Sequence, residues 1–227
     1  MTPVPIPARL LVLGALVWLS ATMTGATVEQ SFEDELLNDA TLVFKGVATV
    51  MNPALPASVL LNARAIAVFP RAYRDGGLYY GTGVVSGQSG LDGWSPPAIV
   101  TFQGALPVTL ESDVVDFVFV AHSARGVDYL TQARYMAPVW DTIAAGPVAN
   151  SVHLTKADIV AYMRFSTYVA GVTIADWEFA EVRASNERLY GHPYSTNEIF
   201  RTAGFFHLPK SARAWRDALA AYFRNAS

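Results

Sequence analysis

Residues 114–121, VVDFVFVA, are the stretch that decides the fold class. They are rich in valine and phenylalanine, which favour strands, and Asp116 is their only charged residue. A membrane-spanning helix needs about 20 apolar residues, so this run is too short to be one. A largely buried β-strand is therefore predicted here.

Similar short apolar runs lie on both sides of this strand. Turn-forming glycine, proline and serine residues separate most of them. Such runs favour an antiparallel sheet, because parallel strands need crossover connections of a dozen or more residues. The predicted strands are 65–69, 78–85, 98–102, 159–165 and 168–174, with turns at 86–90 and 143–148.

Apolar residues recur at helical spacing near both ends of the remaining chain. Residues 29–51 and 210–224 each place them on one face, which predicts two amphipathic helices. Residues 176–190 could start a helix at Asp176, although Trp177 and Phe179 are typical of a strand. Shorter helices are predicted at 57–63, at 125–134, and at 195–204 with Ser195 or Thr196 as the N-cap. The predicted class is α+β: an antiparallel β-sheet or barrel-like core, an N-terminal helix pair and a C-terminal amphipathic helix.

The first 26 residues have the pattern of a secretory signal peptide. Arg9 precedes an apolar run at 10–19, and small residues then offer cleavage positions at Ala21 and Ala26. We expect one domain, residues 27–227, to reach the periplasm or the exterior after cleavage. The alternative is an uncleaved N-terminal anchor.

Composition excludes several function classes. Apolar residues make up 52% of the chain and charged residues 15%, which is typical of a globular protein. The net charge is −3, so a nucleic-acid partner is not expected. The sequence has no cysteine, which rules out disulfides, thiolate catalysis and cysteine-ligated metals. The four histidines lack metal-ligand spacing, and neither a cofactor nor a metal is expected.

No sequence pattern indicates a catalytic site. His122 and Ser123 follow the 114–121 strand, but adjacent strand residues point to opposite faces. We therefore expect these residues to cap the next helix rather than to form a nucleophile and its base. For Asp116, a structural role is favoured over a site role. An unrecognised hydrolase using Ser123, His122 or Asp116 stays as a minor alternative.

Two groups of residues are candidates for ligand binding. The first is Trp94-Ser95, followed by Pro96-Pro97, which is either the wall of a ligand groove or a rigid turn with its indole in the core. The second is a scattered set of basic residues, including Arg71 and Arg164, which would form an anionic headgroup site if several converge.

Taken together, these segments resemble the SYLF-domain family. Six motifs occur in the family's order across roughly residues 35–203. They are ARAIAVFP at 63–70, GxGVV with GWSPPA at 81–98, DxVxV at 116–120, AAGPV at 144–148, YxR with AGVTI at 162–174, and NERLYG at 186–191.

The resemblance implies a compact α+β domain that binds lipids. Eukaryotic members of the family bind phosphoinositides and regulate membrane-linked actin, whereas an exported bacterial member would not meet actin. Arg164 is the matching basic residue that carries over. Ser166-Thr167 replaces a lysine-glycine pair usual in the family, which argues against phosphoinositides as the ligand.

The expected function is therefore that of an exported, non-enzymatic lipid-binding or membrane-associated protein of the bacterial envelope. Its partner would be a phospholipid or a membrane surface, and the candidate lipid-binding residues are Arg164, Arg71, Trp94 and Ser95. The alternative is an envelope scaffold module without a lipid ligand.

Overall fold

The computed structural model describes residues 30–49, 56–89, 93–107, 110, 112–137, 142–146, 157–202 and 207–226. The predicted signal peptide lies outside the described residues. The helices are α1 (Phe32–Thr49), α2 (Ala57–Leu61), α3 (Ala124–Thr131), α4 (Arg183–Tyr190), α5 (Thr196–Arg201) and α6 (Lys210–Ala226). The strands are β1 (Ala65–Asp75), β2 (Leu78–Ser89), β3 (Gly93–Trp94), β4 (Ala98–Ala105), β5 (Val114–Ala121), β6 (Arg134–Met136), β7 (Ala144–Ala145), β8 (Ile159–Phe165), β9 (Tyr168–Gly171) and β10 (Ala175–Glu181).

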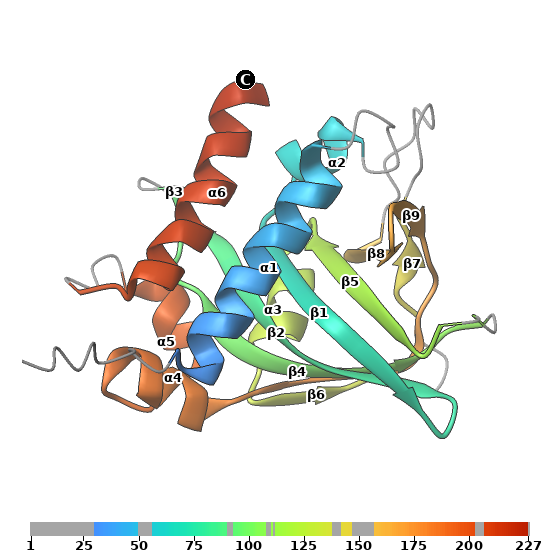
Figure 1. Cartoon of the computed structure of the whole chain (residues 1–227), viewed down its shortest axis with the longest axis horizontal. Coiled ribbons are helices and arrows are strands. Elements are labelled where there is room, and N and C mark those ends of the chain that lie inside the picture. The colour runs from blue at the N-terminus through green and yellow to red at the C-terminus, as the bar shows by residue number, and fades with distance from the viewer. Residues whose placement is uncertain are drawn as a thin grey trace, which may run out of the picture.

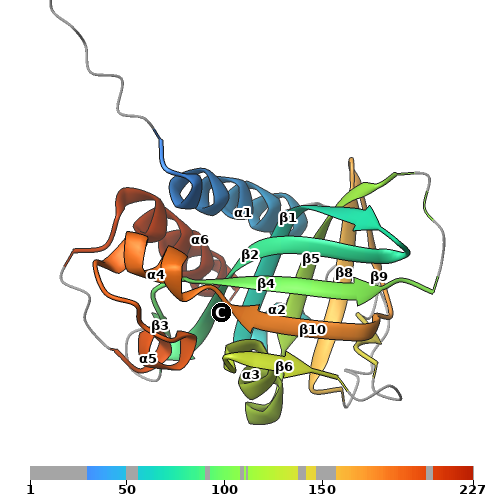
Figure 2. The ribbon, with the colours of Figure 1, turned by 90° about the horizontal axis from the view of Figure 1, so that it is seen from below.

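The strand predicted at 114–121 is β5, and it lies near the middle of one large sheet. The sheet order is β6-β10-β4-β2-β1-β5-β8-β7, with β3 paired to β2 and β9 paired to β8. Every pairing between named strands is antiparallel except that of β7 with β8. Figure 2 shows β5 and β8 behind β2, β4 and β10, so the sheet curls into a half-barrel. The predicted α+β class with a barrel-like sheet is confirmed.

Alternation along the strands divides the core into two layers. In β1, Ile66 and Val68 face the helices, whereas Ala67 and Phe69 face the inside of the curl. The inside holds a cluster of phenylalanine rings with centroids 4.8–6.0 Å apart. Its members are Phe69, Phe102, Phe117, Phe119 and Phe179. A Cβ atom at Gly83 would lie 2.4 Å from the Phe69 ring, so this glycine allows a close approach of the ring to the strand.

Helices α1 and α6 lie side by side over the outer face of the sheet (Figure 1). Trp215 of α6 is fully buried, and its ring meets Phe44 of α1 edge-on at 5.9 Å. Its indole Nε1 donates a 2.9 Å hydrogen bond to Ser86 Oγ of β2. This bond fixes α6 against the sheet, and the last turns of α6 then lie beside β3.

In two places the structure differs from the local predictions. The turn predicted at 86–90 is strand up to Ser89, because Ser86 and Gly87 pair with Ile66 and Ala65 of β1. The segment from Asp176, for which the sequence left a helix start or a strand open, is strand β10, because residues 178–180 pair with both β4 and β6. The helix after it, α4, starts only at Arg183.

Candidate functional site

A groove of about 940 Å³ lies where α3, α5 and α6 meet the ends of β2 and β3. This volume is within the range of roughly 300–1,000 Å³ that is typical of small-molecule sites. We call it the Trp94 groove. It is lined by Arg64, Gly87, Gln88, Ser89, Gly93, Trp94, Ala124, Val127, Asp128, Asn197, Phe200, Arg201, Ala220 and Phe223.

Aromatic rings form one wall of the groove. Trp94 pairs with Gln88 across β3 and β2, and its ring lies 4.9 Å from that of Phe223 in α6. Trp94 is only 4% exposed. Its indole is therefore part of the core and of the groove wall at once, which combines the two alternatives that the sequence left open for this residue.

A second ring, Phe200 of α5, lies directly against strand β2. A Cβ atom at Gly87 would be 2.5 Å from this ring. Glycine at this position therefore lets α5 approach the strand closely, and that contact places Phe200 in the groove.

Ser95 stabilises the backbone beside Trp94. The Gly87 N–H donates to Ser95 Oγ at 3.1 Å, and the Ser95 N–H donates to the Gly87 carbonyl at 2.8 Å. The Ser95 hydroxyl donates to the carbonyl of Pro96 at 2.9 Å. Because the side chain is buried and its hydroxyl is bound to the chain itself, Ser95 holds the backbone beside Trp94 in place rather than lining the groove.

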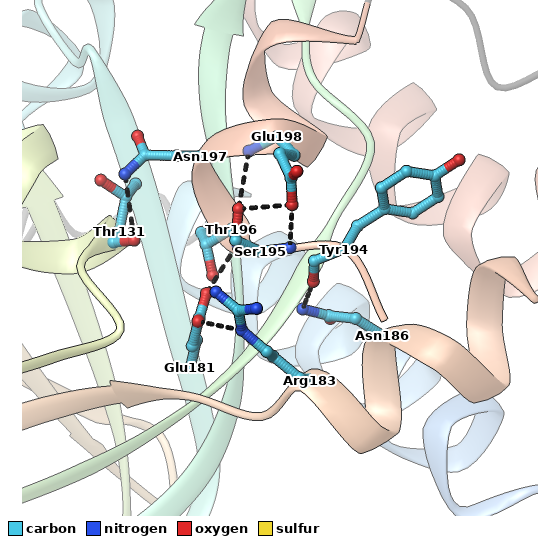
Figure 3. Close-up of polar contacts among 9 residues, drawn as sticks. All are labelled: Thr131, Glu181, Arg183, Asn186, Tyr194, Ser195, Thr196, Asn197 and Glu198. Carbon is cyan, nitrogen blue, oxygen red and sulfur yellow. Dashed lines mark hydrogen bonds and ion pairs between the residues drawn. The ribbon is translucent and has the colours of Figure 1, made fainter. Parts of the chain in front are cut away.

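Polar contacts hold α5 in place beside the groove (Figure 3). Ser195 is its N-cap and forms a reciprocal capping box with Glu198, as the sequence predicted for Ser195 or Thr196. Hydrogen bonds to Ser195 lower the pKa of Glu198. Glu181 accepts from the Thr196 N–H at 3.0 Å, and Asn197 donates to the Thr131 carbonyl at 3.4 Å. These bonds tie α5 to β10 and α3.

The charges of the groove are two arginines and one aspartate. Arg64, Arg201 and Asp128 are all exposed. In the described part of the chain, neither arginine takes part in an ion pair. The groove therefore joins an apolar wall to a small excess of positive charge, a combination that suits an amphipathic anion.

The four predicted lipid-binding residues fall in two places. Trp94 and Ser95 lie at the groove, whereas Arg71 and Arg164 lie at the other end of β1. Ala65 pairs with Gly87 beside the groove, and Arg71 is six residues further along, or roughly 20 Å at the rise of a strand. Their lipid-binding role stays a prediction.

Asp116 joins Arg71 and Arg164. Its carboxylate accepts the Arg71 backbone N–H at 2.9 Å and Arg164 Nε at 2.7 Å. Arg71 stands in a β-bulge with a positive φ of 50°, which turns its N–H toward Asp116. The structural role favoured for Asp116 matches these contacts.

The two guanidinium groups also anchor helix α1. Arg71 lies 2.6 Å from Asp39 and 3.3 Å from Glu35, both of α1. A Cβ atom at Gly46 would lie 2.7 Å from the Arg164 guanidinium, so glycine makes room for it. With Asp116 included, three carboxylates meet two guanidinium groups, and the cluster has no excess of positive charge.

His122 and Ser123 do not face one another as a base and a nucleophile. His122 Nε2 lies 3.1 Å from the Val59 carbonyl, and burial lowers the pKa of this histidine. Ser123 is the N-cap of α3, as predicted, and accepts from the Gly126 N–H at 2.9 Å. Its hydroxyl donates to the carboxylate of Asp158.

Sequence reasoning missed Arg64, Phe200 and Arg201. Arg64 directly precedes β1, whereas Phe200 and Arg201 are the last two residues of α5, and no sequence spacing links the two places. Phe223 was expected on the apolar face of the C-terminal helix, but its contact with Trp94 crosses 129 positions of the chain and depends on how α6 docks.

Among the described residues, no helix has the length and apolar character needed to cross a bilayer. The same residues contain no cluster of three acidic or histidine side chains that could hold a metal ion.

Comparison with known proteins gives one match. The family model described as Ysc84, Las17-binding protein actin regulator, matches residues 108–222. No curated protein and no solved structure matches the chain. The matched region includes Asn197, Phe200, Arg201 and Ala220 of the groove.

Proposed function

Because this chain belongs to the Ysc84, or SYLF-domain, family of Las17-binding protein actin regulators, we propose that it is a binding protein whose ligand is a membrane lipid. We further propose that it is exported to the bacterial envelope and acts there without catalysing a reaction. An exported protein would not meet actin, so lipid rather than actin is the proposed partner.

The observation that carries this proposal is the composition of the Trp94 groove. Trp94, Phe200 and Phe223 offer an apolar surface on which an acyl chain can pack. Arg64 and Arg201 at the same groove would meet a phosphate or carboxylate headgroup, because guanidinium forks suit oxyanions. An anionic amphiphile would satisfy both parts at once.

Flotation with liposomes tests this proposal. The chain from residue 27 onward would be mixed with vesicles of neutral lipid alone or with an added anionic lipid. The variant Arg64→Gln/Arg201→Gln should lose affinity for the anionic vesicles. Each basic residue near an anionic surface contributes about 1 kcal/mol, so the double variant should bind roughly 30-fold more weakly.

The matched control is Lys210→Gln/Arg213→Gln. It removes the same charge from exposed positions in the first turn of α6. Position 213 is seven residues before Ala220 in the helix, or about 10 Å along its axis. Control protein should float like the unmodified chain. Equal losses in both double variants would mean that net charge, and not the groove, decides binding.

Export is tested separately. The full chain would be expressed in a Gram-negative bacterium, and the protein in the periplasmic fraction would be weighed by mass spectrometry. Cleavage after Ala21 or Ala26 is expected. Full-length protein held in the inner membrane would instead support the uncleaved anchor.

The alternative function, a scaffold without a lipid ligand, is favoured by a different observation. Tyr73, Phe165 and Tyr168 are exposed by 47–64% near the far end of the half-barrel. Exposed aromatic residues are also typical of protein interfaces. Failure of the protein to float with any vesicle would move the proposal to this alternative.

A further inference from the structure

A second, smaller cavity lies between α3, β8 and β10, and it is lined by other residues of α3 than the Trp94 groove. Its volume of about 200 Å³ corresponds to roughly seven water molecules at 30 Å³ each. It is lined by Arg125, Tyr129, Thr142, Ile143, Ala157, Asp158, Ile159 and Trp177.

Trp177 is the unusual residue of this cavity. Its side chain is 2% exposed, and its indole Nε1 has no hydrogen-bond partner in the described part of the structure. A buried N–H group without an acceptor is costly, and buried indoles usually find a partner. A bound molecule that carries an oxygen acceptor would supply the missing bond.

Two opposite charges stand at the same cavity. Arg125 Nε and Asp158 Oδ2 are 3.7 Å apart, which is longer than the 2.7–2.9 Å of a direct charge-assisted hydrogen bond. The other oxygen of Asp158, Oδ1, accepts from Ser123. The same Nε of Arg125 donates to the Tyr129 hydroxyl, and the guanidinium lies over the Tyr129 ring at 5.2 Å. Because the contact between Arg125 and Asp158 is long, a ligand ammonium can compete for Asp158 Oδ2 while a ligand oxyanion approaches the guanidinium.

The wall behind these charges is aromatic and rigid. The rings of Tyr129 and Tyr135 are 4.4 Å apart, and those of Tyr135 and Trp177 stack at 5.2 Å. This packing fixes the orientation of the Trp177 indole. It also offers aromatic surface to a cation held near Asp158.

We propose that this cavity binds a small zwitterion with an oxyanion at one end and a primary ammonium at the other. The oxyanion would accept from the Trp177 N–H and the Arg125 guanidinium, while the ammonium would donate to Asp158. Phosphoethanolamine and α-amino acids have this chemistry. Phosphoethanolamine is also the headgroup of phosphatidylethanolamine, so the ligand is either a free solute or part of a lipid.

Calorimetric titration of the chain from residue 27 onward tests the proposal. Phosphoethanolamine and glycine are the probes, with inorganic phosphate and ethanolamine as half-ligands. Phosphoethanolamine should bind at least about tenfold more tightly than either of its halves. Trp177→Phe keeps an aromatic ring and removes the N–H, and it should weaken binding about tenfold or more.

Two further variants guard against a folding artefact. Asp158→Asn removes the charge but keeps an acceptor for Ser123, and it should weaken phosphoethanolamine binding more than inorganic phosphate binding. Asp113→Asn removes an exposed aspartate elsewhere and should bind like the unmodified chain. Melting temperatures would show that each variant is folded.

The outcomes distinguish a free solute from a lipid as the source of the ligand, and this cavity from the Trp94 groove as the binding site. Binding to phosphatidylethanolamine vesicles but not to free zwitterions, lost in Trp177→Phe, would support the proposal with a lipid as the source. The groove variant Arg64→Gln/Arg201→Gln should keep the zwitterion site, so failure of the groove proposal leaves this one standing. No binding of any probe, or equal binding by all three single variants, would overturn it.

Discussion

Replacing Asp116 with alanine should destabilise the protein far more than the same change at Asp113. Both carboxylates pair with an arginine, through Arg164 Nε at 2.7 Å and Arg74 Nε at 2.9 Å. Their surroundings differ, because the Asp116 side chain is 15% exposed and that of Asp113 is 68% exposed. Asp116 also accepts the backbone N–H of the bulged residue Arg71.

The magnitude follows from these contacts. Loss of one partner of a buried ion pair costs about 3–5 kcal/mol, and a hydrogen bond to a charged group contributes about 1.5–3 kcal/mol. The Arg164 side chain is 26% exposed, which reduces the contribution of the ion pair to this cost. We therefore expect Asp116→Ala to lower the free energy of unfolding by about 2–4 kcal/mol, and Asp113→Ala by at most about 1 kcal/mol.

Urea denaturation followed by tryptophan fluorescence measures both values. The slope of the transition should stay the same in each variant, so that the midpoints report stability. Helix α1 should exchange its amide hydrogens faster in Asp116→Ala, because the network that anchors it is broken. Equal midpoints for the two variants would refute the role given to the Asp116 network.

Three other changes test separate parts of the fold. Burial raises the pKa of Glu33, but hydrogen bonds from Arg188, Ser185 and the backbone, together with the charge of Arg188, lower it below its ordinary value of 4.5. The resulting stability is present at neutral pH and is lost as the pH falls below about 4.5. Glu33→Gln should therefore flatten the acid limb of the stability–pH curve, and an unchanged limb would contradict this. Phe119→Ala should lower the free energy of unfolding, measured by urea denaturation, by about 3–5 kcal/mol. Phe165 is half-exposed, so Phe165→Ala should lower it by less than about 1 kcal/mol. Similar losses in the two variants would contradict the assignment of Phe119 to the core. Ser195→Ala removes the N-cap of α5 and should lower the free energy of unfolding by about 1 kcal/mol, measured in the same way. An unchanged free energy of unfolding would show that Glu181 alone holds the start of the helix.

Much of the fold could be predicted from local patterns. Alternation and β-branched content identified β5, and helical spacing identified α1 and α6, because these elements bury one continuous face each. The errors occurred where pairing with distant strands overrides local preference. Ser86 and Gly87 stay in β2 because β1 pairs with them, and Asp176 belongs to β10 because that strand pairs with both β4 and β6.

The candidate site was less predictable because it depends on tertiary docking. Trp94 was singled out from its proline-rich surroundings, but its partner Phe223 reaches it only once Trp215 has fixed α6 on the sheet. Arg71 and Arg164 were expected to converge if a basic site formed. They do converge, although on carboxylates of the chain itself, because the register of β5 against β8 sets Asp116 opposite Arg164.

The most direct test of the central claim, that the Trp94 groove holds lipid, is native mass spectrometry of a variant whose groove is filled. Ala220→Trp places a large ring among the lining residues, whereas Asn38→Trp places the same ring on the exposed face of α1. After incubation with an anionic phospholipid, the unmodified chain and Asn38→Trp should carry a lipid adduct, and Ala220→Trp should not. Equal lipid adducts on Ala220→Trp and the unmodified chain would contradict the account.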